Sequence, residues 1–205
     1  PIAKKVQFDF QKENYSVLVV DTGGNHADLT EDYAAIPSEM KAVARIFGKE
    51  VLREVSVEQI YDNVQEIRNK LGDRAVLRSF HFVNENKRVS DQVTALMSGD
   101  FTKFLSIIKA SGDSSYKLLQ NIYTTKNVME QGISLALAVT ENYMLKVNAG
   151  ACRVHGGGFA GTILAFLPKE LVENYIKEIE PIFGKNSVTV LAIRQYGTLY
   201  LNDFE

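Results

Sequence analysis

The chain has 205 residues, of which 45% are hydrophobic and 23% are charged, and its formal net charge at pH 7 is -2. A chain of this length and composition can bury a core of its own, as one large domain or two small ones. The near-neutral charge argues against binding to nucleic acid or to an anionic membrane surface. One cysteine excludes an internal disulfide, and no apolar run has the length of a membrane span or the arrangement of a signal peptide, so we expect a cytoplasmic protein.

The first two thirds of the chain predict two strands followed by a long helical middle. The strands are expected over residues 4–10 and Tyr15–Asp21. A helix is expected within residues 36–48, where the apolar side chains recur at helical spacing and Gly48 stands where a helix would end. Further helical patterns cover residues 57–71, 83–97, 101–110 and 126–143, with breaks at Ser98 and Ser111.

The last third predicts mostly strands. They are expected over Ala151–Val154, residues 162–167 and residues 187–193, with a helix over residues 169–183 before the final strand. No repeat or linker divides the chain, so one compact unit is expected. The pattern predicts an α+β fold, with helices packed on one face of a mostly antiparallel sheet.

Two motifs suggest chemistry that their surroundings do not support. Asp21-Thr22-Gly23 follows an apolar run, as in aspartic proteases, but two carboxylates must share one proton there and the chain has no second copy. Gly156, Gly158 and Gly161 fit G-x-G-x-x-G, a spacing that binds dinucleotides when a helix follows it. Here β-branched and apolar residues follow. We therefore predict a buried strand ending in a glycine turn and, later, a glycine loop that joins two strands.

The remaining candidates for chemistry are weak. Cys152 and His155 are three residues apart on an extended segment, which points them to opposite faces and argues against a thiol–imidazole pair. His26, His81 and His155 have no metal-ligand spacing with acidic residues, so no metal site is predicted. The residues by themselves indicate a soluble α+β domain with one unusual glycine loop, which can hold positive φ angles and approach another backbone or a phosphate closely.

Two segments carry a resemblance to a known family. DTGGNHADLTEDYAAIPSEM (21–40) and GACRVHGGGFAGTILAFLP (150–168), in this order and separation, resemble the C-terminal half of bacterial galactokinases in the GHMP kinase superfamily. VNENKRV, ALMSGDF and SGDSSYKLLQN between them are similar to helical segments of the family. The resemblance implies that residues 1–205 form a GHMP kinase C-terminal (ferredoxin-like) domain together with the preceding sugar-contacting segment.

The resemblance also implies roles for particular residues. Tyr33 aligns with the family tyrosine whose phenol bonds a sugar hydroxyl, although Ala34 replaces the asparagine that usually follows. The run Gly156, Gly157, Gly158, Phe159 and Gly161 matches the third family motif, with Ala160 where most relatives have glycine. By resemblance, this loop supports the phosphate-binding loop of the other half of the kinase.

Three family features do not occur in the sequence: the first sugar-binding motif, the serine loop that holds ATP phosphates, and the catalytic aspartate. We therefore expect a C-terminal fragment with no catalytic residue, no metal and no bound cofactor of its own. In the intact relatives, ATP with Mg²⁺ phosphorylates the C1 hydroxyl of galactose or a related sugar. The fragment is expected to be inactive, and the surface exposed by truncation, around residues 156–161 and Tyr33, could hold it in dimers. A non-catalytic sugar sensor or a free-standing ligand-binding module remain alternatives.

Overall fold

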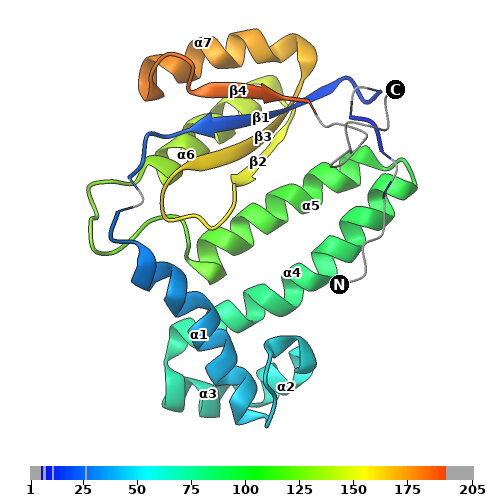
Figure 1. Ribbon diagram of the computed structural model, residues 1–205. Helices are drawn as coiled ribbons and strands as arrows, with labels where there is room; N and C mark the ends of the chain where they lie inside the picture. The colour runs from blue at the N-terminus through cyan, green and yellow to red at the C-terminus, as the bar shows by residue number, and fades with distance from the viewer. Residues whose placement is uncertain (1–5, 7, 11, 26, 193–205) are drawn as a thin grey trace, which may run out of the picture.

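The computed structural model describes residues 6, 8–10, 12–25 and 27–192. One antiparallel sheet organises the upper part of the molecule (Figure 1). Its strand order is β2-β3-β1-β4. The strands are β1 (Tyr15–Asp21), β2 (Ala151–Val154), β3 (Thr162–Pro168) and β4 (Val188–Leu191).

The order of elements along this sheet is that of a split β-α-β fold. With α6 (Gly132–Val147) and α7 (Val172–Phe183), the chain runs β1, α6, β2, β3, α7, β4. Central β1 pairs with β3 along its full length, from Tyr15 opposite Pro168 to Asp21 opposite Thr162. Such a sequence of elements with this strand order is the ferredoxin-like arrangement. All other helices of eight residues or more in the described chain are inserted between β1 and α6.

One face of the sheet packs on α6 and α7. Side chains alternate between the faces of a strand, so every second residue of β1 and β3 points to these helices. The resulting core contains residues from the strands and from both helices, including Tyr175 and Ile179 of α7, which are fully buried. Its strand members are Leu18, Val20, Cys152, Val154, Ile163, Ala165 and Leu167.

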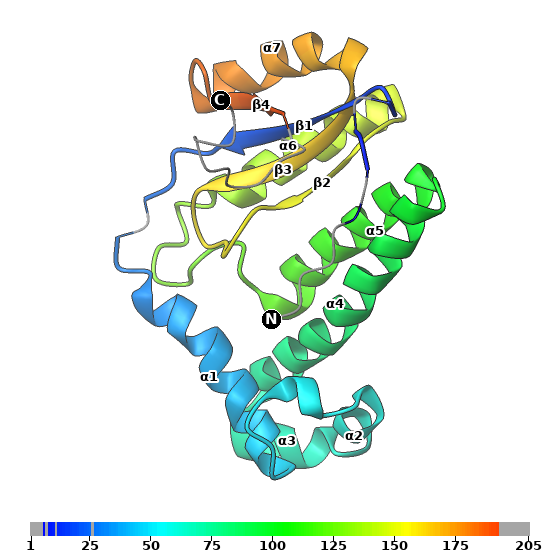
Figure 2. The ribbon, with the colours of Figure 1, turned by 45° about the vertical axis from the view of Figure 1, so that its right-hand side comes forward.

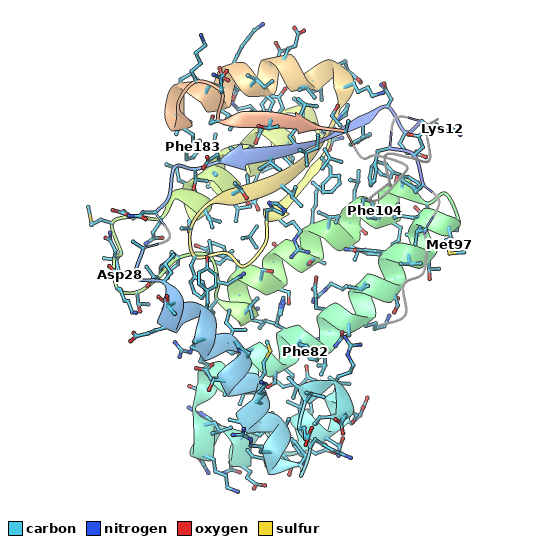
Figure 3. All side chains as sticks on the ribbon, viewed as in Figure 1. Lys12, Asp28, Phe82, Met97, Phe104 and Phe183 are labelled. Atoms are coloured by element: carbon cyan, nitrogen blue, oxygen red, sulfur yellow. The ribbon has the colours of Figure 1, made fainter. Side chains whose placement is uncertain are left out.

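The opposite face of the sheet is covered in part by α5 (Phe101–Ser114). Val17, Ala151 and Phe166 pack there against Phe104 and neighbouring apolar side chains of α5. In Figure 2, α5 runs below the strands while α7 lies above them, and in Figure 3 Phe104 lies between α5 and the sheet. The predicted α+β class with an antiparallel sheet is confirmed, and α5 adds a partial layer on the second face.

A helical arm extends below the sheet and has a core of its own (Figure 1). It contains α1 (Thr30–Ile46), a short 3-10 turn (Leu52–Glu54), α2 (Val57–Asp62), α3 (Val64–Leu71) and the first half of α4 (Asp73–Met97). Buried members of its core come from α1, α2, α3 and α4: Val43, Ala44, Ile60, Ile67, Ala75 and Val76. Because α4 continues upward beside α5, it joins this arm to the sheet.

Several predicted boundaries differ from the structure. The break at Ser111 is wrong: α5 continues to Ser114 and then forms a π turn over Ser115–Leu119. The Ser111 hydroxyl instead donates to the Glu85 carboxylate of α4. The helix expected over 83–97 begins at Asp73, and the one expected from residue 126 begins at Gly132.

The helix expected over 57–71 is interrupted at Asn63, and the one expected within 36–48 begins at Thr30. Residues 169–183 form a 3-10 turn (Lys169–Leu171) and then α7. The first predicted strand is absent at residues 8–10, and residues 4, 5 and 7 lie outside the described residues, as does residue 193 of the last predicted strand.

Candidate functional site

The glycine loop connects β2 to β3 as a hairpin between neighbouring antiparallel strands. The backbone has positive φ at Gly156, Gly158, Phe159 and Gly161. Positive φ is uncommon for a residue with a side chain, so Phe159 is held there by its surroundings. β3 starts at Thr162, directly after the loop. The prediction of a loop between two strands is confirmed. The described residues that follow the loop form β3 instead of the helix whose N-terminus would receive a dinucleotide pyrophosphate.

The turn after β1 holds the end of this loop. The Thr22 main-chain N–H and its hydroxyl both donate to the Gly161 carbonyl, at 2.9 and 2.7 Å. A Cβ on Gly24 would lie 3.1 Å from the Gly161 nitrogen, so the two backbones pass close to each other. The Asp21 carboxylate accepts the Gly23 N–H at 2.9 Å. The Asp-Thr-Gly motif is therefore a structural turn that supports the glycine loop.

Tyr33 lies in the first turn of α1 and contacts the same loop. Its hydroxyl donates to the Gly158 carbonyl at 2.8 Å, and its ring stands edge-on to Phe159 with 5.3 Å between centroids. A Cβ on Gly157 would lie 2.7 Å from the Tyr33 Cε1. Burial raises the pKa of the Tyr33 phenol above its ordinary value of 10.0. The structure thus brings together the two parts of the candidate site that the sequence places far apart.

The loop presents only part of itself to solvent. Gly156 and Gly157 are exposed, whereas Gly158 and Phe159 are buried and Gly161 is half-buried. The expectation of an exposed surface over residues 156–161 and Tyr33 therefore applies fully to the first two glycines alone. A dimer formed through that surface stays a prediction, to be measured by sedimentation.

Asn121 is a site residue that the sequence did not indicate. It follows the π turn, is 2% exposed, and donates from Nδ2 to the Gly157 carbonyl at 3.0 Å. Its main-chain carbonyl accepts the Phe159 N–H at 2.5 Å. No motif or periodicity marks this asparagine, because its importance lies in a contact between segments 36 residues apart.

The segment after Asn121 is attached to the start of α1. The Thr124 hydroxyl donates to the Asp32 carboxylate at 3.0 Å, and Lys126 Nζ lies 2.7 Å from Glu31. The hydrogen bond from Lys126 lowers the pKa of Glu31, and the same bond raises the pKa of Lys126. Both ends of the Lys126–Glu31 pair are exposed, so it adds little stability.

The other residues considered for chemistry have structural surroundings. Cys152 is buried in the core, where burial raises the pKa of its thiol to about 12, while His155 is exposed and contacts the Thr162 hydroxyl. His81 is buried between α4 and α5, with Nδ1 3.0 Å from the Ser114 hydroxyl. His26 lies outside the described residues. Within the described ranges, no three or more His, Cys, Asp or Glu side chains gather so that they could hold a metal ion.

The fold of this sheet with its inserted helices is similar to that of solved galactokinase and mevalonate kinase structures. Lactococcus lactis galactokinase complexed with galactose superimposes with a TM-score of 0.64 and 21% identity, over 87% of this chain and 42% of that one. L. major mevalonate kinase in complex with R-mevalonate superimposes with a TM-score of 0.51 and 13% identity, over 92% of this chain and 44% of that one. At these identities the likeness concerns the fold.

The sequence itself is similar to galactokinases. It is 31% identical to the galactokinase of Mannheimia succiniciproducens over 174 residues and 30% identical to that of Haemophilus influenzae over 175 residues. Each match covers 85% of this chain and 43% of the relative, so the chain spans less than half the length of these curated relatives. No family model matches the chain. The resemblance to galactokinases read from the two motif segments is confirmed.

Proposed function

We propose that this chain is the C-terminal part of a galactokinase-like sugar kinase. In the whole protein the γ-phosphate of ATP would pass to the C1 hydroxyl of galactose, in the cytoplasm. The observation that supports this most is the similarity to galactokinases along 85% of the chain. The contact between Tyr33 and the glycine loop adds to it, because the two segments that resemble the family are hydrogen-bonded to each other.

In this proposal Tyr33 binds the sugar. A phenol hydroxyl has one proton to donate and lone pairs that accept. The Tyr33 proton is directed to the Gly158 carbonyl, so toward a sugar hydroxyl the phenol oxygen would act as an acceptor. Its bond to the loop would then fix the oxygen in place before the sugar arrives, which lowers the entropy lost on binding.

The exposed tip of the glycine loop, Gly156 and Gly157, would pack beneath the phosphate-binding loop of the rest of the kinase. Phosphoryl transfer depends almost entirely on positioning and on stabilisation of phosphate charge. ATP and Mg²⁺ belong to the whole protein in this proposal.

Of the described helices, none has the length and apolarity to cross a bilayer.

A complementation assay tests the proposal. The 205-residue chain is incubated with galactose and Mg-ATP, alone and mixed with a separately produced N-terminal half of the same parent protein. We expect no turnover by the chain alone and turnover in the mixture. Turnover by the chain alone would contradict the proposal. Galactose binding without turnover in the mixture would favour the sugar sensor, and binding by the chain alone would favour a free-standing module.

A further inference from the structure

Asn121 holds the glycine loop on both sides of Gly158. Its side-chain Nδ2 donates to the carbonyl that precedes Gly158 in the loop, and its main-chain oxygen accepts the N–H of Phe159 that follows. The Gly158 carbonyl itself is bonded by the Tyr33 hydroxyl. Thr22 holds the end of the loop at Gly161, and Asn121 and Tyr33 hold the part around Gly158. Of these residues from outside the hairpin, Tyr33 is the proposed sugar ligand.

The loop and Asn121 approach each other too closely for any side chain between them. A Cβ on Gly158 would lie 1.9 Å from the Asn121 carbonyl oxygen and 2.6 Å from its Nδ2. Gly158 also has φ +80°, a conformation that other residues rarely adopt. The need for glycine at this position is thus set largely by Asn121.

The orientation of the Asn121 amide is determined by this contact. If the amide were turned over, its oxygen would face the Gly157 carbonyl oxygen, and two acceptors repel each other. In the observed orientation the Asn121 Oδ1 is buried and has no hydrogen-bond partner among the described residues. A buried acceptor without a partner destabilises a fold. The bonds that Asn121 makes to the loop therefore explain the asparagine at this position better than a contribution to the free energy of folding does.

The segment that begins with Asn121 also reaches the helix turn that carries Tyr33. Thr124 is bonded to Asp32, the neighbour of Tyr33 in the chain. Asn121 is bonded to the glycine loop, and Thr124, three residues later in the chain, is bonded to the first turn of α1. This short segment therefore connects the loop to α1. Movement of Asn121 would shift the loop relative to Tyr33.

We propose that Asn121 is a positioning residue that fixes the shape of the glycine loop and, through the Gly158 carbonyl, the place of the Tyr33 hydroxyl. Its consequence for catalysis rests on the proposed kinase function, whereas its hold on the loop does not. In the kinase, a displaced loop would lower kcat by roughly tenfold to a hundredfold, since small misplacements near reacting groups have effects of this size.

The first test measures amide hydrogen exchange in the 205-residue chain. Asn121→Asp keeps the shape of the side chain but replaces the donor by a charged acceptor, and Asn121→Ala removes the side chain while the main-chain bond to Phe159 remains. Asn127→Asp is the matched control, because Asn127 is exposed in the same segment and uses its oxygen as an acceptor. We expect at least tenfold faster exchange at the Phe159 amide in both Asn121 variants, with the amides of β1 unchanged.

Several results would overturn the proposal. The first is an unchanged rate of amide exchange at Phe159. The second is an exchange rate that rises as much in β1 as at Phe159. The third is failure of both variants to fold. Equal acceleration or unfolding would show a role in the whole core instead of the loop. The second test measures kcat and KM in the complementation assay. We expect Asn121→Ala to lower kcat because the loop is displaced, and to raise the KM for galactose because the Tyr33 hydroxyl moves with the loop, whereas Asn127→Asp should change neither. If the unaltered mixture has no turnover, the kinase function fails while hydrogen exchange still decides the role of Asn121.

Discussion

Glycines 156 and 158 both have positive φ, yet their surroundings predict different sensitivity to substitution. At Gly156 an added Cβ would meet no atom within 4 Å, so Gly156→Ala introduces backbone strain alone, about 1–2 kcal/mol. Gly158→Ala adds a collision with the Asn121 carbonyl to the same strain. We expect it to reduce the free energy of unfolding by about 3 kcal/mol or more. Urea unfolding of both variants measures the difference, and an equal loss in both would contradict the interlocked packing.

Tyr33→Phe tests the proposed sugar contact. In the complementation assay we expect the KM for galactose to rise about fivefold, because loss of one hydrogen bond removes on the order of 1 kcal/mol. The KM for ATP should change less. Tyr61→Phe is the control, since Tyr61 is exposed on the helical arm and its ring lies tilted against that of Phe80. Equal effects on both KM values, or none, would count against Tyr33 as a sugar ligand.

Arg78 connects three segments and is 2% exposed. Its Nη1 lies 2.9 Å from Glu39 of α1, and its Nε donates to the Leu119 carbonyl at the end of the π turn. Arg78→Ala would leave the Leu119 carbonyl without this donor and would open a space where the buried side chain stands. It should therefore reduce the free energy of unfolding by about 2–4 kcal/mol. Arg74→Ala removes an exposed partner of the same Glu39 and should cost less than about 1 kcal/mol. Chemical denaturation of the two variants compares them directly, and similar losses would contradict this account.

The contact between α4 and α5 should weaken in acid. Burial, the largest influence, lowers the pKa of His81 below its ordinary value of 6.5. The unfolded chain therefore binds this proton more readily than the folded chain. The stability that neutral His81 contributes is fully present above about pH 6.5 and declines as the pH falls through 6.5 toward the lower folded pKa. We expect a smaller decline between pH 7 and 5 in His81→Gln, measured by urea unfolding at each pH. An unchanged decline would contradict the assignment.

The strands of the sheet could be predicted closely from sequence, while helix boundaries could not. Ala151–Val154 and Tyr15–Asp21 match exactly, because buried strands form short apolar runs bounded by turn residues. The Ser111-Gly112 pair is typical of a break, yet it lies inside α5. A Cβ on Gly112 would be 3.1 Å from the Cys152 carbonyl of β2, so this glycine allows the helix to approach the sheet edge.

The same reasoning applies to the candidate site. Tyr33 and the glycine loop could be identified from motif segments, because each has a recognisable local sequence. Asn121 could not, since its two bonds to the loop exist only after distant segments have packed together. A single sequence contains no signal for such a pairing.

The helical arm and the sheet have separate apolar cores, so the complete chain could unfold in one step or in two. α4 contributes Ala75 and Val76 to the core of the arm and Ala95 to the core between α5 and the sheet. Unfolding α4 between Val76 and Ala95 would also break the contacts of the Glu85 carboxylate. This carboxylate accepts a hydrogen bond from Ser111 of α5 and lies 3.4 Å from Arg153 of β2.

We therefore expect one cooperative urea transition for the 205-residue chain, without any partner protein. Circular dichroism, which reports mainly on the helices, and near-ultraviolet absorbance of the tyrosines should give the same midpoint. Ser111→Ala is the sharpest variant for this question, because it removes one link between α4 and α5 without opening a large cavity. It should lower the shared midpoint while the two signals remain coincident. Separate midpoints in the unaltered chain would show that the arm and the sheet fold independently.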